Sequence, residues 1–204
     1  MIRSKKGGSF LVPRYNYVYE KAAEFLEDLQ ENLIYPLDFE KIISSKGWNL
    51  FKYSDLDKLH YSISPDGYSL YASNNFNIFI NMFQPSSRRQ FTYGHEIGHI
   101  TLNHHLEFKK DLLSHNSDVK DALEREANCF ARLIIAPAEI IRFLRPRTPY
   151  LIHKIFNVSQ QVAEIRLTWV NKDFERSKFN NQLTIFKVFQ DINAKMEKII
   201  DNME

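Results

Sequence analysis

The segment His95-Glu96-Ile97-Gly98-His99 combines residue types and a spacing that are suited to metal chemistry. Two histidines four residues apart on a helix lie about 40° apart around its axis, so both imidazoles can reach one metal ion. The intervening Glu96 then points to the side where a water activated by the metal would lie. The segment therefore predicts a helix with two zinc ligands, His95 and His99, and a general base, Glu96.

The helix that carries this segment is expected over residues 87–103 and has apolar side chains on all sides, which is typical of a buried helix. Isolated ionised groups are costly inside a protein, so the two imidazoles and the carboxylate must be paired, hydrogen-bonded or bound to a metal. The alternative is that His95 and His99 are hydrogen-bonded core residues with no metal.

A catalytic zinc site commonly has three protein ligands, and His105 is one candidate for the third. It stands ten residues after His95, where a longer histidine pattern would place a ligand, but Leu102 replaces the glycine that turns the chain in that pattern. Without this glycine we expect the helix to continue, which leaves His104 and His105 exposed or outside the set of ligands.

The stronger candidate is Glu126, in a helix expected over residues 117–135. Glu126 is the charged residue within the apolar stripe of this helix, whereas Glu124 and Asn128 fall on the polar side. A carboxylate in an apolar stripe needs a cation, and no neighbouring basic residue shares its face. A zinc ion would satisfy it, although a chance position near the surface is the alternative. Cys129, at the edge of the stripe, is expected only to pack as a small buried side chain.

Composition excludes several classes of protein. A single Cys forms neither an internal disulfide nor a cysteine-based zinc site, and 27 basic against 25 acidic residues is a mild balance for a nucleic-acid-binding specialist. No apolar run approaches the roughly 20 residues of a membrane-spanning helix. We therefore expect a soluble, cytoplasmic protein. Five of the seven histidines lie in residues 95–115, a concentration that composition alone does not explain.

The remaining patterns predict an α+β fold that is mostly helical. A small antiparallel sheet of three or four strands is expected from aromatic and β-branched runs at residues 48–53, 61–63, 68–72 and 77–82. Helical patterns precede the sheet at 15–33 and after Pro36, and follow it at 87–103, 117–135, 137–144, 150–156, 159–171 and 183–202. The expected organisation is a flexible basic tail (1–14), a catalytic part (15–145) and a helical C-terminal region (146–204).

The C-terminal region has the pattern of a helix-turn-helix, with Ser159 as the N-cap of its second helix. This helix offers few cations, Arg166 and Lys172, beside Glu164 and Asp173, whereas a helix that follows phosphates is normally richer in basic residues. The sequence therefore disfavours direct nucleic-acid binding and favours a structural wall or a platform that docks a protein substrate.

Two blocks of the sequence occur in a familiar order and spacing. The first runs from Arg89 to His99, and the second begins 27 residues after His99 with Glu126-Ala127-Asn128-Cys129-Phe130-Ala131 and ends with Ile135-Ala136-Pro137. Together they resemble the ImmA/IrrE family of prokaryotic metallopeptidases. The likeness covers about residues 15–170 and departs at Gly94, where the family more often has Ala. It implies a zincin-like catalytic part with His95, His99 and Glu126 as metal ligands and Glu96 as the general base.

The resemblance also implies a function. Members of the family are soluble, site-specific endopeptidases that cut a cognate helix-turn-helix transcriptional repressor of a mobile element or a stress response. The expected cofactor is Zn²⁺, and the expected partner is a protein substrate. The alternative is a regulatory or DNA-binding protein that uses its helix-turn-helix-like C-terminal region and keeps a structural metal site.

Overall fold

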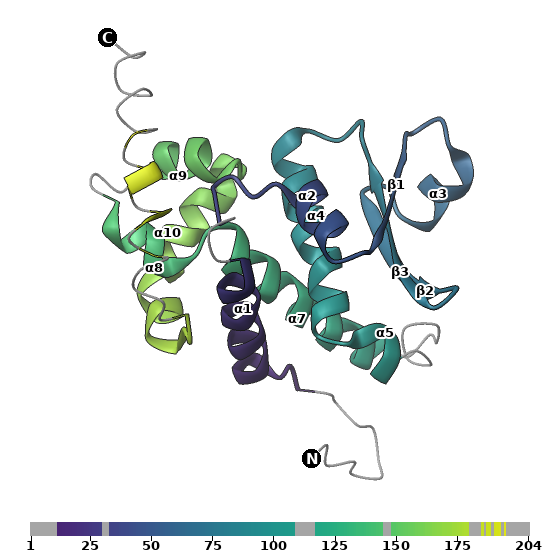
Figure 1. Ribbon diagram of the computed structural model, residues 1–204, viewed down its shortest axis with the longest axis horizontal. Helices are drawn as coiled ribbons and strands as arrows, with labels where there is room; N and C mark the ends of the chain where they lie inside the picture. Colours follow the sequence, from purple (N-terminus) through teal and green to yellow (C-terminus); the bar gives the residue numbers. More distant parts are fainter. Residues whose placement is uncertain are drawn as a thin grey trace.

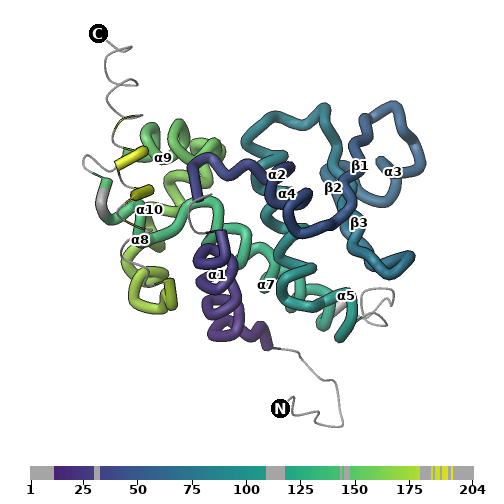
Figure 2. Tube along the Cα trace, in the orientation of Figure 1, coloured from purple at the N-terminus to yellow at the C-terminus, as the bar shows by residue number. Residues whose placement is uncertain are grey.

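The sheet and the C-terminal helices occupy opposite ends of the molecule. The computed structural model describes residues 12–29, 33–108, 117–144 and 148–179 and parts of 185–194. Figure 1 shows the small sheet at one end, helices α8, α9 and α10 at the other, and α1, α4 and α7 between them, and the tube in Figure 2 shows the same arrangement. This mainly helical α+β architecture confirms the expected fold class. Within the described ranges, no helix combines the length and apolar character needed to cross a membrane.

The boundaries of the elements follow the sequence patterns closely. The strands are β1 (Asn49–Tyr53), β2 (Gly67–Ala72) and β3 (Asn75–Asn81). The helices are α1 (Tyr15–Leu29), α2 (Phe39–Ser45), α3 (Lys58–Ile63), α4 (Ser86–Thr101), α5 (His104–Glu107), α7 (Ser117–Ile135), α8 (Ala138–Phe143), α9 (Pro149–Phe156) and α10 (Gln160–Arg176). The helix expected over 117–135 has these bounds in the structure, whereas the one expected over 183–202 lies largely outside the described residues.

The sheet differs from the prediction in two respects. Its strand order is β1-β3-β2, with β1 parallel to β3, so the sheet is mixed and not antiparallel throughout. Residues 61–63, expected as a strand, belong to α3, because a three-residue segment with one aromatic and one β-branched residue does not distinguish a strand from a short helix. The hairpin between β2 and β3 turns at Ser73 and Asn74, which both have left-handed backbone angles (φ 53° and 59°).

Helices α4 and α7 pack closely because two glycines of α4 face α7. A Cβ atom on Gly98 would lie 3.2 Å from both the Ala127 carbonyl oxygen and Phe130 Cδ1. At Gly94, the position that departs from the family pattern, it would lie 2.8 Å from Ile135 Cδ1. The missing side chains therefore let the two helix backbones approach, which brings the segment His95–His99 against the middle of α7.

The C-terminal helices form the predicted helix-turn-helix-like pair. Helix α9 ends at the left-handed Asn157 (φ 51°), and Ser159 caps α10 by accepting a hydrogen bond from the Val162 amide at 3.2 Å, so the expected N-cap is confirmed. Arg166, counted as a candidate phosphate-binding cation, is fully buried and donates from Nε and Nη2 to the Ala136 carbonyl at 2.9 and 2.7 Å. Its guanidinium therefore holds the fold together and does not face a ligand.

One hydrophobic core runs through most of the described chain. It joins apolar side chains of α1, α4 and α7 to those of α8, α9 and α10, and it includes Ile78 and Ile80 of β3. This core therefore extends across residue 145, where the sequence suggests a domain boundary. The proposed division at that residue remains a prediction.

Candidate metal centre and active site

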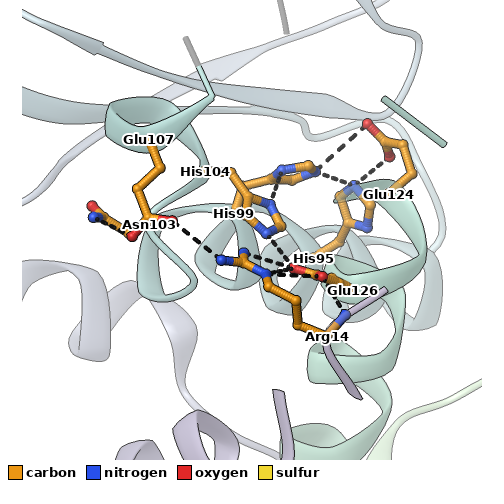
Figure 3. A network of polar contacts seen from close by, with 8 residues as sticks. All are labelled: Arg14, His95, His99, Asn103, His104, Glu107, Glu124 and Glu126. Atoms are coloured by element: carbon orange, nitrogen blue, oxygen red, sulfur yellow. Dashed lines mark hydrogen bonds and ion pairs between the residues drawn. The ribbon is translucent and has the colours of Figure 1, made fainter. Parts of the chain in front are cut away.

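Two histidines of α4 and one glutamate of α7 place their ligand atoms together. The Nε2 atoms of His95 and His99 are 3.1 Å apart. Glu124 Oε2 lies 3.1 Å from His95 Nε2, and Glu124 Oε1 lies 3.6 Å from His99 Nε2. One ligand atom from each of the three residues falls within 4.8 Å of the others, so the group has the composition and convergence of a metal site (Figure 3).

The chemistry of this group fits zinc. Two histidine nitrogens and one glutamate oxygen form a common ligand set of catalytic zinc sites, which leave a further position open. Two nitrogens bound about 2.0–2.1 Å from one tetrahedral ion are roughly 3.3 Å apart, close to the 3.1 Å between the two Nε2 atoms. The second nitrogen of His95, Nδ1, lies 3.0 Å from Asn128 Oδ1, and such a hydrogen bond orients a metal-binding imidazole.

Glu124 reaches the histidines because it sits at the border between the core and the open cleft. Glu124 and Asn128 are four residues apart and therefore share one side of α7, adjacent to Ala127, which packs on Gly98. The Glu124 side chain is 39% exposed. This intermediate position explains why hydrophobic periodicity assigned it to the polar side of the helix: ligands that face a cleft are not part of the apolar stripe.

The structure places Glu126 elsewhere. Two residues along a helix correspond to about 200° of rotation, so Glu124 and Glu126 point in nearly opposite directions from α7. The fully buried Glu126 carboxylate accepts hydrogen bonds from the Arg14 backbone amide at 2.6 Å and from the Arg14 guanidinium at 2.9–3.2 Å. Its Oε2 also lies 3.0 Å from His104 Nε2. The expected need of Glu126 for a cation is met here by an arginine, and the structure does not group it with His95 and His99.

The chain turns directly after α4, contrary to the expectation that the helix continues. The turn is made by Asn103, which adopts the left-handed conformation (φ 62°) that the absent glycine would have provided at the neighbouring position. The turn directs His104 into the interior, where it is fully buried, and its Nδ1 lies 3.0 Å from His99 Nδ1. His104 is therefore not an exposed residue but a direct neighbour of a predicted ligand.

Glu96 lies on the cleft side of the same helix and is held by β2. Ser69 of β2 donates a hydrogen bond from Oγ to Glu96 Oε2 at 2.6 Å, and the same Oγ lies 2.9 Å from His105 Nε2. Burial, together with the nearby His99 and His104, lowers the pKa of His105 to about 4. His105 is therefore neutral at neutral pH, and it contacts Ser69 and not the ligand atoms of the metal group.

These residues open onto a cleft of about 830 Å³ between β2, α4 and the first half of α7. Its walls include Tyr68 and Tyr71 of β2 and Phe91 of α4, in addition to the metal group and Glu96. Apolar walls with a few convergent polar groups are typical of a binding site. The outer edge of β2, which borders this cleft, pairs with no other strand among the described residues.

The charges of the site are coupled through hydrogen bonds. Burial would raise the pKa of Glu124, but the adjacent imidazoles of His95 and His99 outweigh it and hold this pKa well below its usual range. Burial would lower the pKa of His95, but Glu124 and Glu96 outweigh it and raise this pKa. Burial likewise opposes ionisation of Glu126, whose pKa is nevertheless lowered to about 2 by His104 and Arg14. Both glutamates are therefore ionised at neutral pH.

Three further polar residues of this part of the sequence, Tyr93, Cys129 and His115, lie away from the metal group or outside the described chain. The Tyr93 hydroxyl donates to Glu40 Oε1 at 3.3 Å, on the far side of α4 from the ligand atoms. Cys129 is buried, and burial raises the pKa of its thiol to about 11, consistent with a packing role. His115 lies outside the described residues.

Comparison with known protein families matches residues 51–168 to the IrrE N-terminal-like domain, Peptidase_M78, over more than half of the chain. The chain belongs to this family. Membership confirms the resemblance to the ImmA/IrrE metallopeptidases, and a metallopeptidase implies a bound metal, for which His95, His99 and Glu124 are available. The matched region contains the whole metal group and Glu96, whereas Arg14 precedes it. A comparison with curated proteins found no match.

Sequence reasoning missed several residues that shape this site: Glu124, Asn128, Ser69 and Arg14. For the first two a signal existed, because a glutamate and an asparagine four residues apart share one side of a helix. For Ser69 and Arg14 no local signal existed, since their contacts with Glu96 and Glu126 span 27 and 112 residues of sequence.

Proposed function

We propose that this member of the Peptidase_M78 family is a zinc-dependent endopeptidase in which His95, His99 and Glu124 hold the metal and Glu96 is the general base. The observation that carries the proposal is the convergence of three zinc-type ligand atoms within 4.8 Å, at the wall of a cleft that also contains Glu96. We thus propose Glu124 as the third ligand in place of Glu126, because Glu126 is already paired with Arg14 and His104 and is not grouped with His95 and His99.

A zinc ion in this group would act as a Lewis acid that polarises the peptide carbonyl and lowers the pKa of water. Glu96 would accept a proton from the attacking water on a carboxylate oxygen and deliver it to the leaving amine nitrogen. The Ser69 hydroxyl, 2.6 Å from Glu96 Oε2, limits the rotation of this carboxylate. Ser69 therefore orients the base from the opposite wall of the cleft.

The edge strand β2 is suited to bind an extended segment of a protein substrate. An unpaired strand edge offers backbone amide and carbonyl groups with which a peptide can form a further strand. Gly67, Ser69 and Tyr71 alternate along this strand at the wall of the cleft. A peptide bound along this edge would pass close to Glu96, because Ser69 of the same strand contacts that residue.

The natural substrate that we propose is a cognate helix-turn-helix transcriptional repressor of a mobile element or a stress response, cut in the cytoplasm. The resemblance to the ImmA/IrrE peptidases supports this substrate class. The cleft supports a protein substrate, since it is bordered by a strand edge and not closed around a small molecule.

The test combines metal analysis with a single substitution. The purified chain is expected to contain about one zinc ion and to cut a helix-turn-helix repressor, if its gene neighbourhood encodes one, with the products identified by mass spectrometry. Glu96→Gln should keep the zinc content and lower the rate of cleavage by about 10²–10⁴-fold, the usual contribution of a general base.

Glu20→Gln is the matched control, because Glu20 is an exposed residue of α1 outside the cleft. It should cut at the wild-type rate. Cleavage that survives complete removal of metal would contradict the zinc-peptidase proposal, and wild-type cleavage by Glu96→Gln would contradict the assignment of the base. Cleavage of other proteins but not of the repressor would refute only the proposed substrate.

A further inference from the structure

His99 has a second polar neighbour besides the metal group, and this neighbour is itself held by a buried ion pair. His104 Nδ1 lies 3.0 Å from His99 Nδ1, and His104 Nε2 lies 3.0 Å from Glu126 Oε2 (Figure 3). Both His104 and Glu126 are fully buried. The contacts form a continuous line from a buried carboxylate to one of the proposed zinc ligands.

The direction of each hydrogen bond follows from the acceptor at the end of the line. Both oxygens of the Glu126 carboxylate accept hydrogen bonds from Arg14, so this group acts as an acceptor and His104 donates to it from Nε2. A neutral imidazole with its proton on Nε2 has a lone pair on Nδ1. The proton between His104 Nδ1 and His99 Nδ1 therefore belongs to His99, and His99 Nε2 keeps its lone pair.

This lone pair is the one that a metal requires. His99 Nε2 is the atom that lies 3.1 Å from His95 Nε2 and 3.6 Å from Glu124 Oε1. We infer that Glu126 and His104 form a relay that holds His99 in its metal-binding tautomer and orientation. The inference rests on the proposed function, since it takes the metal group to be His95, His99 and Glu124. His104 and Glu126 are positioning residues in this scheme and contact neither metal nor substrate.

Arg14 anchors the outer end of the relay. Its guanidinium and its backbone amide both bind Glu126, and Nη1 donates to Glu107 Oε2 at 3.1 Å. Arg14 therefore links the segment before α1 to α7 and to α5, the short helix that follows the turn at Asn103. The relay thus extends the site to a residue that precedes the region matched by the family.

The relay is tested by zinc affinity, which needs no substrate. His104→Phe keeps an aromatic ring but removes both hydrogen bonds, and it should weaken zinc binding by about 10–100-fold in competition with a chelator, the usual cost of losing a partner that orients a ligand. His104→Gln retains an acceptor and a donor on one side chain, so it should recover most of the affinity. His153→Phe is the control, because His153 Nδ1 bonds to the Val158 carbonyl at the junction of α9 and α10 and does not belong to the metal group.

A double substitution separates a relay from two independent effects. Glu126→Leu alone should also weaken zinc binding, and its combination with His104→Phe should be hardly worse than His104→Phe alone, because both interrupt the same line of contacts. Fully additive losses would contradict the relay. If His104→Phe does not fold, the comparison of His104→Gln with Glu126→Gln replaces it: His104→Gln should bind zinc more tightly, because Glu126→Gln removes the charge that fixes the proton positions.

The outcomes also separate this inference from the proposed function. A wild-type chain that binds no zinc would overturn both. A wild-type chain that binds zinc, together with a folded His104→Phe of equal affinity, would overturn the relay alone. Equal weakening by His104→Phe and His104→Gln would assign His104 a packing role and would likewise overturn the relay.

Discussion

The metal group and the cluster around Asp173 both include polar side chains of α7, but their surroundings differ. The Asp173 carboxylate of α10 accepts hydrogen bonds from Tyr19 of α1 at 2.5 Å, from Arg132 of α7 at 3.2 Å and from Arg166. Asp173 and Arg166 are fully buried, and neither lines the cleft. The donors to the Asp173 carboxylate come from three helices, so this cluster joins α1, α7 and α10.

The metal group is arranged in the opposite way. His95, His99 and Glu124 direct acceptor atoms toward one point at the wall of a cleft, without an arginine or lysine among their hydrogen-bond partners in the described chain. A buried carboxylate that accepts hydrogen bonds from three helices favours one arrangement of those helices. A cluster of convergent acceptors beside a cleft lacks a cation and is suited to bind one. Whether the charged groups already have partners therefore distinguishes a structural cluster from a metal site more clearly than their burial does.

The largest effect on stability is expected from breaking the cluster around Asp173. Asp173→Ala leaves Arg166 buried without its partner and should lower the free energy of unfolding by about 3–5 kcal/mol, measured by urea denaturation. Glu175→Ala, at an exposed position of the same helix, is the control and should change stability by less than about 0.5 kcal/mol. A loss below 1 kcal/mol for Asp173→Ala would contradict the structural role of this cluster.

At the metal group we expect a large loss of zinc binding and little change in stability. Glu124→Ala should weaken zinc binding by more than the roughly 10–100-fold that loss of a ligand's hydrogen-bond partner costs, because it removes a ligand itself. The Glu124 side chain is partly exposed, so without metal the substitution should change stability by less than about 1 kcal/mol.

Asp121→Ala, an exposed position one turn earlier on α7, should leave zinc affinity unchanged and serves as its control. Chelator competition measures the affinity, and thermal unfolding without metal measures the stability. Wild-type zinc affinity for Glu124→Ala, with a large loss for Glu126→Ala, would restore Glu126 as the third ligand.

A smaller, pH-dependent effect on stability is expected at Glu139, beside the cluster around Asp173. Glu139 of α8 is buried, and its Oε1 has no hydrogen-bond partner among the described residues. Burial raises its pKa from 4.5 to about 7, with Arg166 opposing the shift. Because the folded-state pKa is the higher one, the stability that this group contributes is complete below pH 4.5 and is lost as the pH rises through about 7.

Glu139→Gln removes this ionisation, so the variant should gain about 1–3 kcal/mol relative to wild type between pH 4.5 and pH 8. Urea denaturation at the two pH values measures the gain, and Glu164→Gln, at an exposed position of α10, is the control. If the stability of wild type and of Glu139→Gln changed equally with pH, ionisation of Glu139 would not destabilise the fold, and the prediction would be wrong.

Local sequence patterns were sufficient for most of the helices. Hydrophobic periodicity predicted α7 over its observed bounds, and the capping preference of serine predicted the start of α10. The patterns failed where the outcome depends on neighbours: residues 61–63 form part of α3, β1 pairs in parallel with β3, and α4 ends before the left-handed Asn103. Strand pairing in particular joins segments distant in sequence, so a local pattern does not determine it.

The order of the residues is enough to place His95, Glu96 and His99, because a spacing of four residues on one helix puts both imidazoles on one side whatever surrounds them. It also determined that α7 carries two glutamates of different character. Which of them faces His95 and His99 follows from the packing of the helices, since it depends on the rotation of α7 against α4. The contact between Gly98 and Ala127 sets that rotation, directing Glu124 to the cleft and Glu126 to Arg14 and His104.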